Sequence, residues 1–138
     1  MSIVVLVTGG RYYGCRRGND VNSAVQISAM FDALDALHEG PRGPITLIRH
    51  GAAKGADHTA QWWADTHSVR TDPMPADWAA HGDAAGPMRN QAMASKTAAE
   101  PGDKLCLVAP GGRGTADCVR RARAVGIEIV EVEKGCAE

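Results

Sequence analysis

The sequence has few of the features that mark a disulfide-rich, metal-binding or membrane protein. Its four cysteines, Cys15, Cys106, Cys118 and Cys136, form no CxxC pair and no spacing with histidine that is typical of a metal site. No apolar run approaches the length of a membrane-spanning helix, and the first one, at 3–7, is too short for a signal peptide. We therefore expect a cytoplasmic protein with reduced thiols, no membrane contact, no metal and no cofactor.

The chain also lacks a broad excess of charge of either sign. Its 15 lysine and arginine residues nearly balance its 16 aspartate and glutamate residues, so that the net charge is −1. Only 4% of the residues are aromatic, and they form no series for stacking successive bases. Both features make nucleic acid an unlikely partner. The arginines nevertheless gather after two glycine-rich segments, at 11–17 and 113–123, and such local clusters suit a small anionic ligand.

The periodicity of apolar residues predicts a single α/β domain over 1–134, followed by a short tail at 135–138. With 138 residues, 44% of them hydrophobic, the chain is long enough for one packed core. Short apolar segments typical of strands occur at 3–7, 45–48, 69–74, 104–108 and 127–132. The third of them contains Pro73, which favours an edge position.

Helical patterns separate these segments, at about 21–38, 56–67, 87–99 and 115–125. The second helix should bury either Trp62 or Trp63, and Met88 and Met93 are expected in the core. The last helix has an apolar stripe formed by Ala116, Val119, Ala122 and Val125. Strands that alternate with helices predict a Rossmann-like, doubly wound parallel sheet of five strands, in the order 3-2-1-4-5, with helices on both faces.

The segment that most strongly indicates a function is 108–115, Val-Ala-Pro-Gly-Gly-Arg-Gly-Thr. It joins a predicted strand to a predicted helix, and its glycines allow a ligand to approach main-chain N–H groups without meeting a β-carbon. The positive end of the helix dipole adds to the attraction for a phosphate or carboxylate. Arg113 contributes a cation and Thr115 a hydroxyl. The alternative is a plain strand-to-helix turn, but the complete motif favours an anion site.

Two more glycine-rich segments follow the first and second strands, at 9–11 and 51–55. The carboxyl ends of parallel strands meet at one edge of the sheet, so we expect these three loops to form a single site. The residues expected to contact the ligand are Gly9, Gly10, Arg11, Gly51, Ala52, Lys54, Gly55, Asp57, Arg89, Asn90, Gly111, Gly112, Arg113, Gly114 and Thr115.

Five segments, taken in order, resemble the YspA-like group of the SLOG superfamily. They are 8–11, 50–57, 76–78, 86–90 and 110–115. The resemblance spans nearly the whole chain and implies a Rossmann-like fold. It also implies a ligand derived from a nucleotide, because the superfamily includes "Lonely Guy" phosphoribohydrolases, the DNA-processing protein A and sensor domains for nucleotide-derived signals.

The catalytic pattern of the Lonely Guy enzymes is only half present. Those enzymes carry Pro-Gly-Gly-x-Gly-Thr-x-x-Glu, and Cys118 stands where the essential glutamate would be. The adjacent Asp117 points about 100° away around a helix. Arg89 matches their catalytic arginine, and Asp57 or Asp77 could supply the missing carboxylate from another loop. Arg89, Asp57 and Asp77 are therefore the candidate catalytic residues.

These observations favour a domain that binds a nucleotide or another phosphoribosyl-containing molecule, as a sensor or ligand-binding module. The alternative is an N-glycosidase, or phosphoribohydrolase, acting on a nucleoside monophosphate. Asp57 either stabilises the amino terminus of its own helix or contacts the ligand. Trp78 either covers a bound base as a lid or, as we prefer here, covers the core as a plug. A homodimer is expected, because relatives with this fold pair through helix faces and one of Trp62 and Trp63 should be exposed.

Overall fold

A computed structural model of the protein describes residues 1–15 and 22–132. The elements in these ranges are β1 (Ile3–Thr8), α1 (Asn22–Glu39), β2 (Ile45–His50), α2 (Ala56–Thr66), β3 (Arg70–Pro73), α3 (Trp78–His81), the 3-10 helix η1 (Gly82–Ala84), α4 (Ala85–Ala98), β4 (Asp103–Val108), α5 (Arg113–Ala124) and β5 (Glu128–Glu131). The predicted tail at 135–138, Val21, Arg16 and Arg17 lie outside the described residues.

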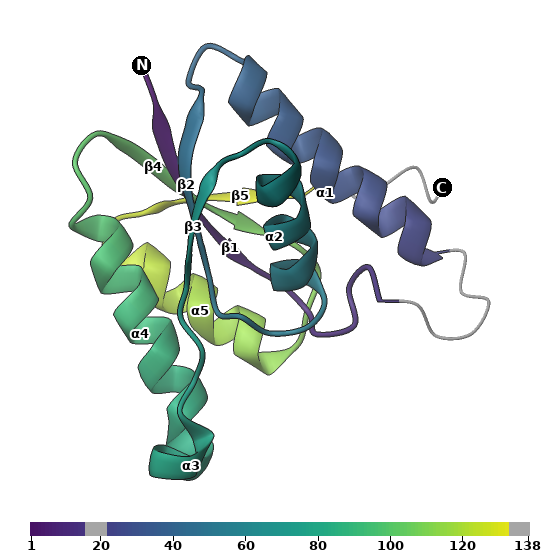
Figure 1. The fold of residues 1–138 in the computed structure, drawn as a ribbon. Helices are drawn as coiled ribbons and strands as arrows, with labels where there is room; N and C mark the ends of the chain where they lie inside the picture. Colours follow the sequence, from purple (N-terminus) through teal and green to yellow (C-terminus); the bar gives the residue numbers. More distant parts are fainter. Residues whose placement is uncertain (16–21, 133–138) are drawn as a thin grey trace.

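The five strands form one parallel sheet in the order β3-β2-β1-β4-β5, which confirms the predicted fold class. β1 is central because its residues are apolar on both faces, and it pairs with β2 on one side and β4 on the other. Helices α1 and α2 cover one face of the sheet, and α4 and α5 cover the other (Figure 1). The strand order reverses between β1 and β4, where ligands of such folds bind.

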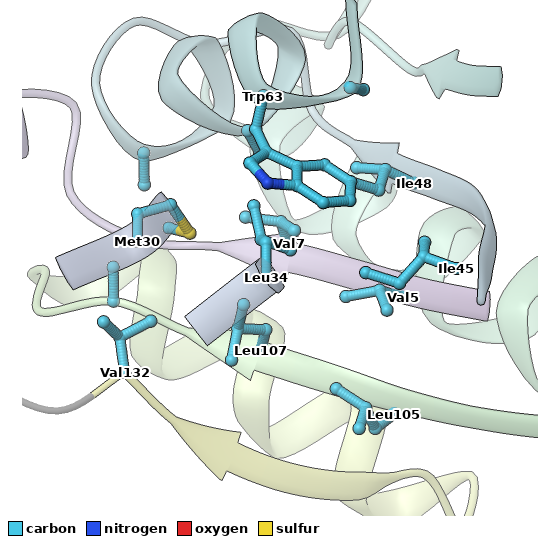
Figure 2. Packing of buried hydrophobic residues seen from close by; sticks show 14 of the residues in the cluster. Val5, Val7, Met30, Leu34, Ile45, Ile48, Trp63, Leu105, Leu107 and Val132 are labelled. Atoms are coloured by element: carbon cyan, nitrogen blue, oxygen red, sulfur yellow. The ribbon is translucent and has the colours of Figure 1, made fainter. Parts of the chain in front are cut away.

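Alternation along the strands divides the core into two layers. Val5 and Val7 of β1 point towards α1 and α2, whereas Leu6 points towards α4 and α5. In the first layer the indole of Trp63 lies over the strand residues (Figure 2). The second layer is smaller, and it includes Cys118. β1 is therefore held on both faces, which fixes the direction in which its carboxyl end leaves the sheet.

The two neighbouring tryptophans of α2 have opposite environments, as their 100° separation around the helix requires. Trp63 is fully buried, and its Nε1 donates to Asp35 Oδ1 at 2.9 Å. Trp62 is 51% exposed and makes an edge contact with Phe31. Trp63 is thus the core residue of the predicted pair. The homodimer stays a prediction.

Some local predictions were wrong. The segment 75–86, to which no strand or helix was assigned, contains α3 and η1. α5 begins two residues earlier than expected. Of its predicted stripe, Ala122 is buried and Val125 packs against the same core layer, but Ala116 is exposed and the helix buries Thr115 and Cys118 instead. Cys118 and Ala122 share the second core layer with strand residues, and this packing sets which face of the helix is buried. Met88 is also 49% exposed, although Met93 is in the core.

A charged network at the carboxyl end of β2 also lies inside the protein. Arg49 is 1% exposed. Its guanidinium pairs with Asp72 at 2.8 Å and Glu100 at 2.5 Å and donates to Thr97 Oγ1 at 3.0 Å. These partners satisfy a cation that would otherwise be costly to bury. The network therefore ties β2 to β3 and to the end of α4.

None of the described helices combines the length and hydropathy needed to cross a membrane.

Candidate functional site

A cavity of about 760 Å³ opens at the carboxyl edge of the sheet, within the usual size range of small-molecule sites. It lies where the loops after β1, β2 and β4 meet the first turns of α4 and α5. Its lining residues are Thr8, Gly9, Gly10, Arg11, Ala53, Asp57, Trp78, Gly86, Pro87, Arg89, Asn90, Met93, Gly112, Arg113, Gly114, Thr115, Ala116, Asp117 and Arg120.

The loop between β4 and α5 presents free main-chain donors to this cavity. Gly112 is the N-cap of α5, and no side chain caps the helix. Within the described part of the chain, the N–H groups of Gly112, Gly114 and Thr115 donate to no acceptor. A β-carbon on Gly112 or Gly114 would have no neighbour within 4 Å. The helix terminus therefore opens into the cavity, with space at the positions where an anion would sit.

Other glycines in the same loops are needed for packing between the loops. Gly10 N donates to Pro110 O at 2.9 Å, and Ala56 N donates to Gly10 O at 3.1 Å, so Gly10 links the three loops. A β-carbon on Gly111 would overlap Thr115 Oγ1 and the nitrogen of Gly10, and one on Gly55 would overlap the carbonyl of Gly10. Neither Gly111 nor Gly55 lines the cavity. They let the loops approach closely, and the cavity depends on that approach.

The segment after β1 carries Arg11 to the cavity. Tyr13 packs into the core, its hydroxyl donates to Gln26 O at 2.9 Å, and Gly14 N donates to Gln26 Oε1 at 2.7 Å. These bonds fix the backbone just beyond Arg11. Both Arg11 and Arg113 are exposed, and neither guanidinium forms a hydrogen bond or ion pair with any described residue. Two cations therefore face the cavity with their hydrogen-bonding capacity unused.

Asp57 closes the loop after β2 with one carboxylate oxygen. Its Oδ2 accepts from Gly51 N at 3.0 Å and from Ala53 N at 3.3 Å. Burial raises the pKa of this carboxyl, although the positive charge of Arg89 and the two N–H groups oppose the shift. Oδ1 accepts from none of the described residues, and Asp57 lines the cavity. Asp57 thus holds its own loop with Oδ2, and its Oδ1 is not used by the described part of the chain.

Arg89 and Asn90 connect α4 to the loops of the site. Arg89 Nη1 donates to Gly51 O at 2.6 Å, and its Nε donates to Asn90 Oδ1 at 3.0 Å. A β-carbon on Gly51 would overlap this guanidinium, so a larger residue there would displace the Arg89 side chain. Asn90 Nδ2 donates to Gly114 O at 3.2 Å and to Asp117 Oδ2 at 3.0 Å. α4 is therefore bonded to the loop after β2 and to the first turn of α5.

Asp117 lines the cavity but is held by basic residues of its own helix. Partial burial would raise the pKa of its carboxyl, but hydrogen bonds from Arg121, at 2.9 Å, and from Asn90 prevail and lower it. Arg120 also pairs with it. The spacing of Asp117 to Arg120 and Arg121, at i,i+3 and i,i+4, was the available sequence signal for this cluster. Asp117 therefore remains ionised and paired at neutral pH.

Cys118 lies beneath the cavity and does not line it. Burial raises the pKa of its thiol to about 11, although a hydrogen bond with Thr8 opposes the shift. The thiol is therefore protonated at neutral pH. It offers neither the carboxylate of the Lonely Guy pattern nor a nucleophilic thiolate.

Of the residues expected to contact a ligand, ten line the cavity: Gly9, Gly10, Arg11, Asp57, Arg89, Asn90, Gly112, Arg113, Gly114 and Thr115. Gly51, Ala52, Lys54, Gly55 and Gly111 do not. Of the loop after β2 only Ala53 reaches the cavity, and its neighbours Ala52 and Lys54 face solvent. Asp77 is also absent from the lining. Its Oδ1 instead accepts from Ala80 N at 3.1 Å and caps α3.

Several lining residues were not predicted. The most prominent is Trp78, which was not among the expected ligand contacts. It is 55% exposed and borders the cavity, so the preferred interpretation as a plug over the core was wrong, and the alternative of a lid over a base stays a prediction. α3 places it there, at the amino-terminal end of α4 (Figure 1). The others are Thr8, Ala53, Gly86, Pro87, Met93, Ala116, Asp117 and Arg120.

A parallel sheet with a cavity bordered by glycine-rich loops at its topological switch point defines a Rossmann-like α/β domain. The profile of the YAcAr family, described as the YspA, cpYpsA-related SLOG family, matches residues 3–81. The Gene 61 protein of Mycobacterium phage D29 is 35% identical over 134 residues, which cover 91% of this chain and 93% of the phage protein. No solved structure matches significantly. The chain belongs to the YspA, cpYpsA-related SLOG family.

Proposed function

We propose that this protein binds a nucleotide, or another phosphoribosyl-containing small molecule, in the cavity and acts as a sensor or ligand-binding module. The observation that carries the proposal is the uncapped amino terminus of α5, which opens into the cavity beside two arginines, Arg11 and Arg113, that pair with none of the described residues. Main-chain N–H groups at a helix terminus, with cations beside them, are a common binding site for phosphate.

The charge of the lining supports an anionic ligand. Four arginines and two aspartates border the cavity, which leaves a local charge of +2 on a chain whose net charge is −1. Two of those arginines, Arg89 and Arg120, already have partners within the protein. Arg11 and Arg113 have no partner among the described residues, and they are consequently the groups that we assign to the phosphate.

The free oxygen of Asp57 fits the ribose of such a ligand. A carboxylate that accepts from ribose hydroxyls is a recurring feature of dinucleotide-binding folds. Asp57 Oδ2 is fixed by two backbone N–H groups, so that Oδ1 is presented in one direction. This rigidity favours specific recognition, because little side-chain freedom is lost when the ligand binds.

Binding without turnover is the expected behaviour. Cleavage of an N-glycosidic bond passes through an oxocarbenium-like transition state, which needs a nearby carboxylate for charge stabilisation and for activating water. Cys118 is buried and neutral, and Asp117 is fully engaged by Arg120, Arg121 and Asn90. A general acid or base contributes about 10²- to 10⁴-fold to a rate, so its loss leaves little activity.

One observation favours the alternative, an N-glycosidase or phosphoribohydrolase acting on a nucleoside monophosphate. Asp57 and Arg89 both line the cavity, and burial raises the pKa of the Asp57 carboxyl. A carboxyl with a raised pKa and one free oxygen is a suitable general acid. In that case Asp57 would take the place of the missing glutamate.

One set of protein–ligand mixtures tests both the proposed binding function and its enzymatic alternative. AMP, ADP-ribose and ribose 5-phosphate are each incubated with the protein, and adenosine serves as the control without phosphate. Thermal unfolding should be shifted by the three phosphate compounds and not by adenosine, and a ligand at 100 times its Kd should add about 2.7 kcal/mol of stability. Equal shifts with AMP and adenosine, or none at all, would contradict the proposed function.

Chromatography of the same mixtures separates binding from hydrolysis. We expect no free adenine. Release of adenine that is lost in Asp57→Asn would establish the enzymatic alternative, because asparagine keeps an oxygen for the Gly51 and Ala53 N–H groups but cannot act as an acid. Cys118→Glu is a poor converse test, because Cys118 is fully buried and the new charge would destabilise the fold.

A further inference from the structure

We propose that Trp78 is the surface on which the planar base of the ligand stacks. The ligand class is then nucleotides with an aromatic base, and simple sugar phosphates are excluded as the preferred ligands. This inference rests on the proposed function, because a phosphate held at the start of α5 fixes the other end of the ligand. Nothing in the family match or in the phage relative assigns a role to this residue.

The indole packs against the first turn of α4. A β-carbon on Gly86, in the first turn of α4, would lie 3.2 Å from Trp78 Cη2 and 3.9 Å from Cζ2 and Cζ3. The six-membered ring therefore rests against the backbone of Gly86. Asp77 Oδ1 accepts from Ala80 N and so caps the short helix α3. This bond fixes the backbone position from which the Trp78 side chain extends. Even so, Trp78 is 55% exposed and borders the cavity.

The other two tryptophans each pack against another aromatic ring, whereas Trp78 packs against none within the described part of the chain. Trp63 is buried, donates to Asp35 and stacks on His67 with ring centroids 4.2 Å apart. Trp62 has an edge contact with Phe31. Within the described part of the chain, Trp78 has no aromatic partner, and α3 has no buried residue. Its exposed ring face is apolar surface that a planar ligand would cover.

The cavity also has the polarity that a nucleotide requires. Trp78 of α3 and Gly86, Pro87 and Met93 of α4 contribute apolar surface to its border, although α4 also brings Arg89 and Asn90 to the lining. Arg113 and the free N–H groups lie at the start of α5. A nucleotide has the same asymmetry, with an apolar base at one end and a phosphate at the other. A volume of about 760 Å³ leaves room for both ends.

Isothermal titration calorimetry with AMP and with ribose 5-phosphate tests the inference. Base stacking on an aromatic side chain increases the affinity about ten- to a hundredfold. Trp78→Ala should therefore weaken AMP binding by that factor and leave ribose 5-phosphate binding unchanged. Trp78→Phe should retain most of the AMP affinity. Trp62→Ala is the matched control, because its side chain is similarly exposed but lies on α2, away from the cavity; it should change neither affinity.

The outcomes separate this inference from the proposed function. If the unaltered protein binds neither compound, the proposed function fails, and the role of Trp78 fails with it. If it binds AMP and Trp78→Ala binds AMP equally well, only the stacking role is overturned. An equal loss for AMP and ribose 5-phosphate in Trp78→Ala would also overturn it, because the residue would then shape the whole cavity. Selective loss of AMP supports it.

Discussion

Gly112→Val should reduce the affinity for AMP at least about a hundredfold while the protein stays folded. A β-carbon at this position meets no atom within 4 Å, and the backbone φ of −99° is ordinary for any residue, so the fold has no reason to change. The valine side chain would instead occupy the space over the free N–H groups. A hydrogen bond to a charged group is worth about 1.5–3 kcal/mol, and the loss of two such bonds exceeds a hundredfold in affinity.

Calorimetry measures the loss, and circular dichroism with thermal unfolding checks the fold. Ala124→Val is the matched control, since it places the same side chain at the exposed far end of α5. It should bind AMP like the unaltered protein. An unchanged affinity in Gly112→Val would show that the anion does not bind at this loop, and the site would have to be sought elsewhere.

The largest effect on stability is expected for Trp63→Ala. The side chain is fully buried between the sheet and α1, its Nε1 has a hydrogen-bond partner in Asp35, and no other residue can fill its volume. Replacing a buried tryptophan with alanine lowers the free energy of unfolding by about 3–5 kcal/mol. Urea unfolding followed by circular dichroism measures this difference.

Trp62→Ala provides the comparison within the same helix. Trp62 is half exposed and contacts mainly Phe31, so its removal should cost less than about 1 kcal/mol. Equal losses for the two variants would mean that the assignment of Trp63 to the core and Trp62 to the surface is wrong. A greater loss for Trp62→Ala would point to a covered surface and so to the predicted homodimer.

The sheet could be predicted from the sequence because its strands have a simple signature. The run at 3–7 is apolar at every position, and such a run fits only a strand covered on both faces. Pro73 placed its strand at an edge, and the sheet order confirms this. The position of Cys106 in an apolar strand indicated its burial, which is complete. Chain order and parallel pairing then left few alternatives for the topology.

The details of the site could not be predicted, because glycines with different tasks look identical in a sequence. Gly111 and Gly112 are neighbours, yet the first is fixed by loop packing and the second opens into the cavity. The sequence also could not distinguish the roles of the neighbouring residues Asp77 and Trp78. Which of them reaches the cavity depends on the short helix α3, whose four residues have no apolar periodicity to reveal it. Its capping aspartate was the only local signal.

The central claim is that three loops form one site for a phosphate-bearing ligand, and amide chemical shifts test it most directly. In an NMR titration of the uniformly ¹⁵N-labelled protein with AMP, the amide signals of Gly10, Ala53, Gly112 and Gly114 should all shift and should saturate at one common Kd. Gly10, Ala53 and Gly112 come from the loops after β1, β2 and β4, Gly114 lies in the first turn of α5, and all of them line the cavity. Shifts confined to one loop, or different Kd values for the three loops, would contradict the account.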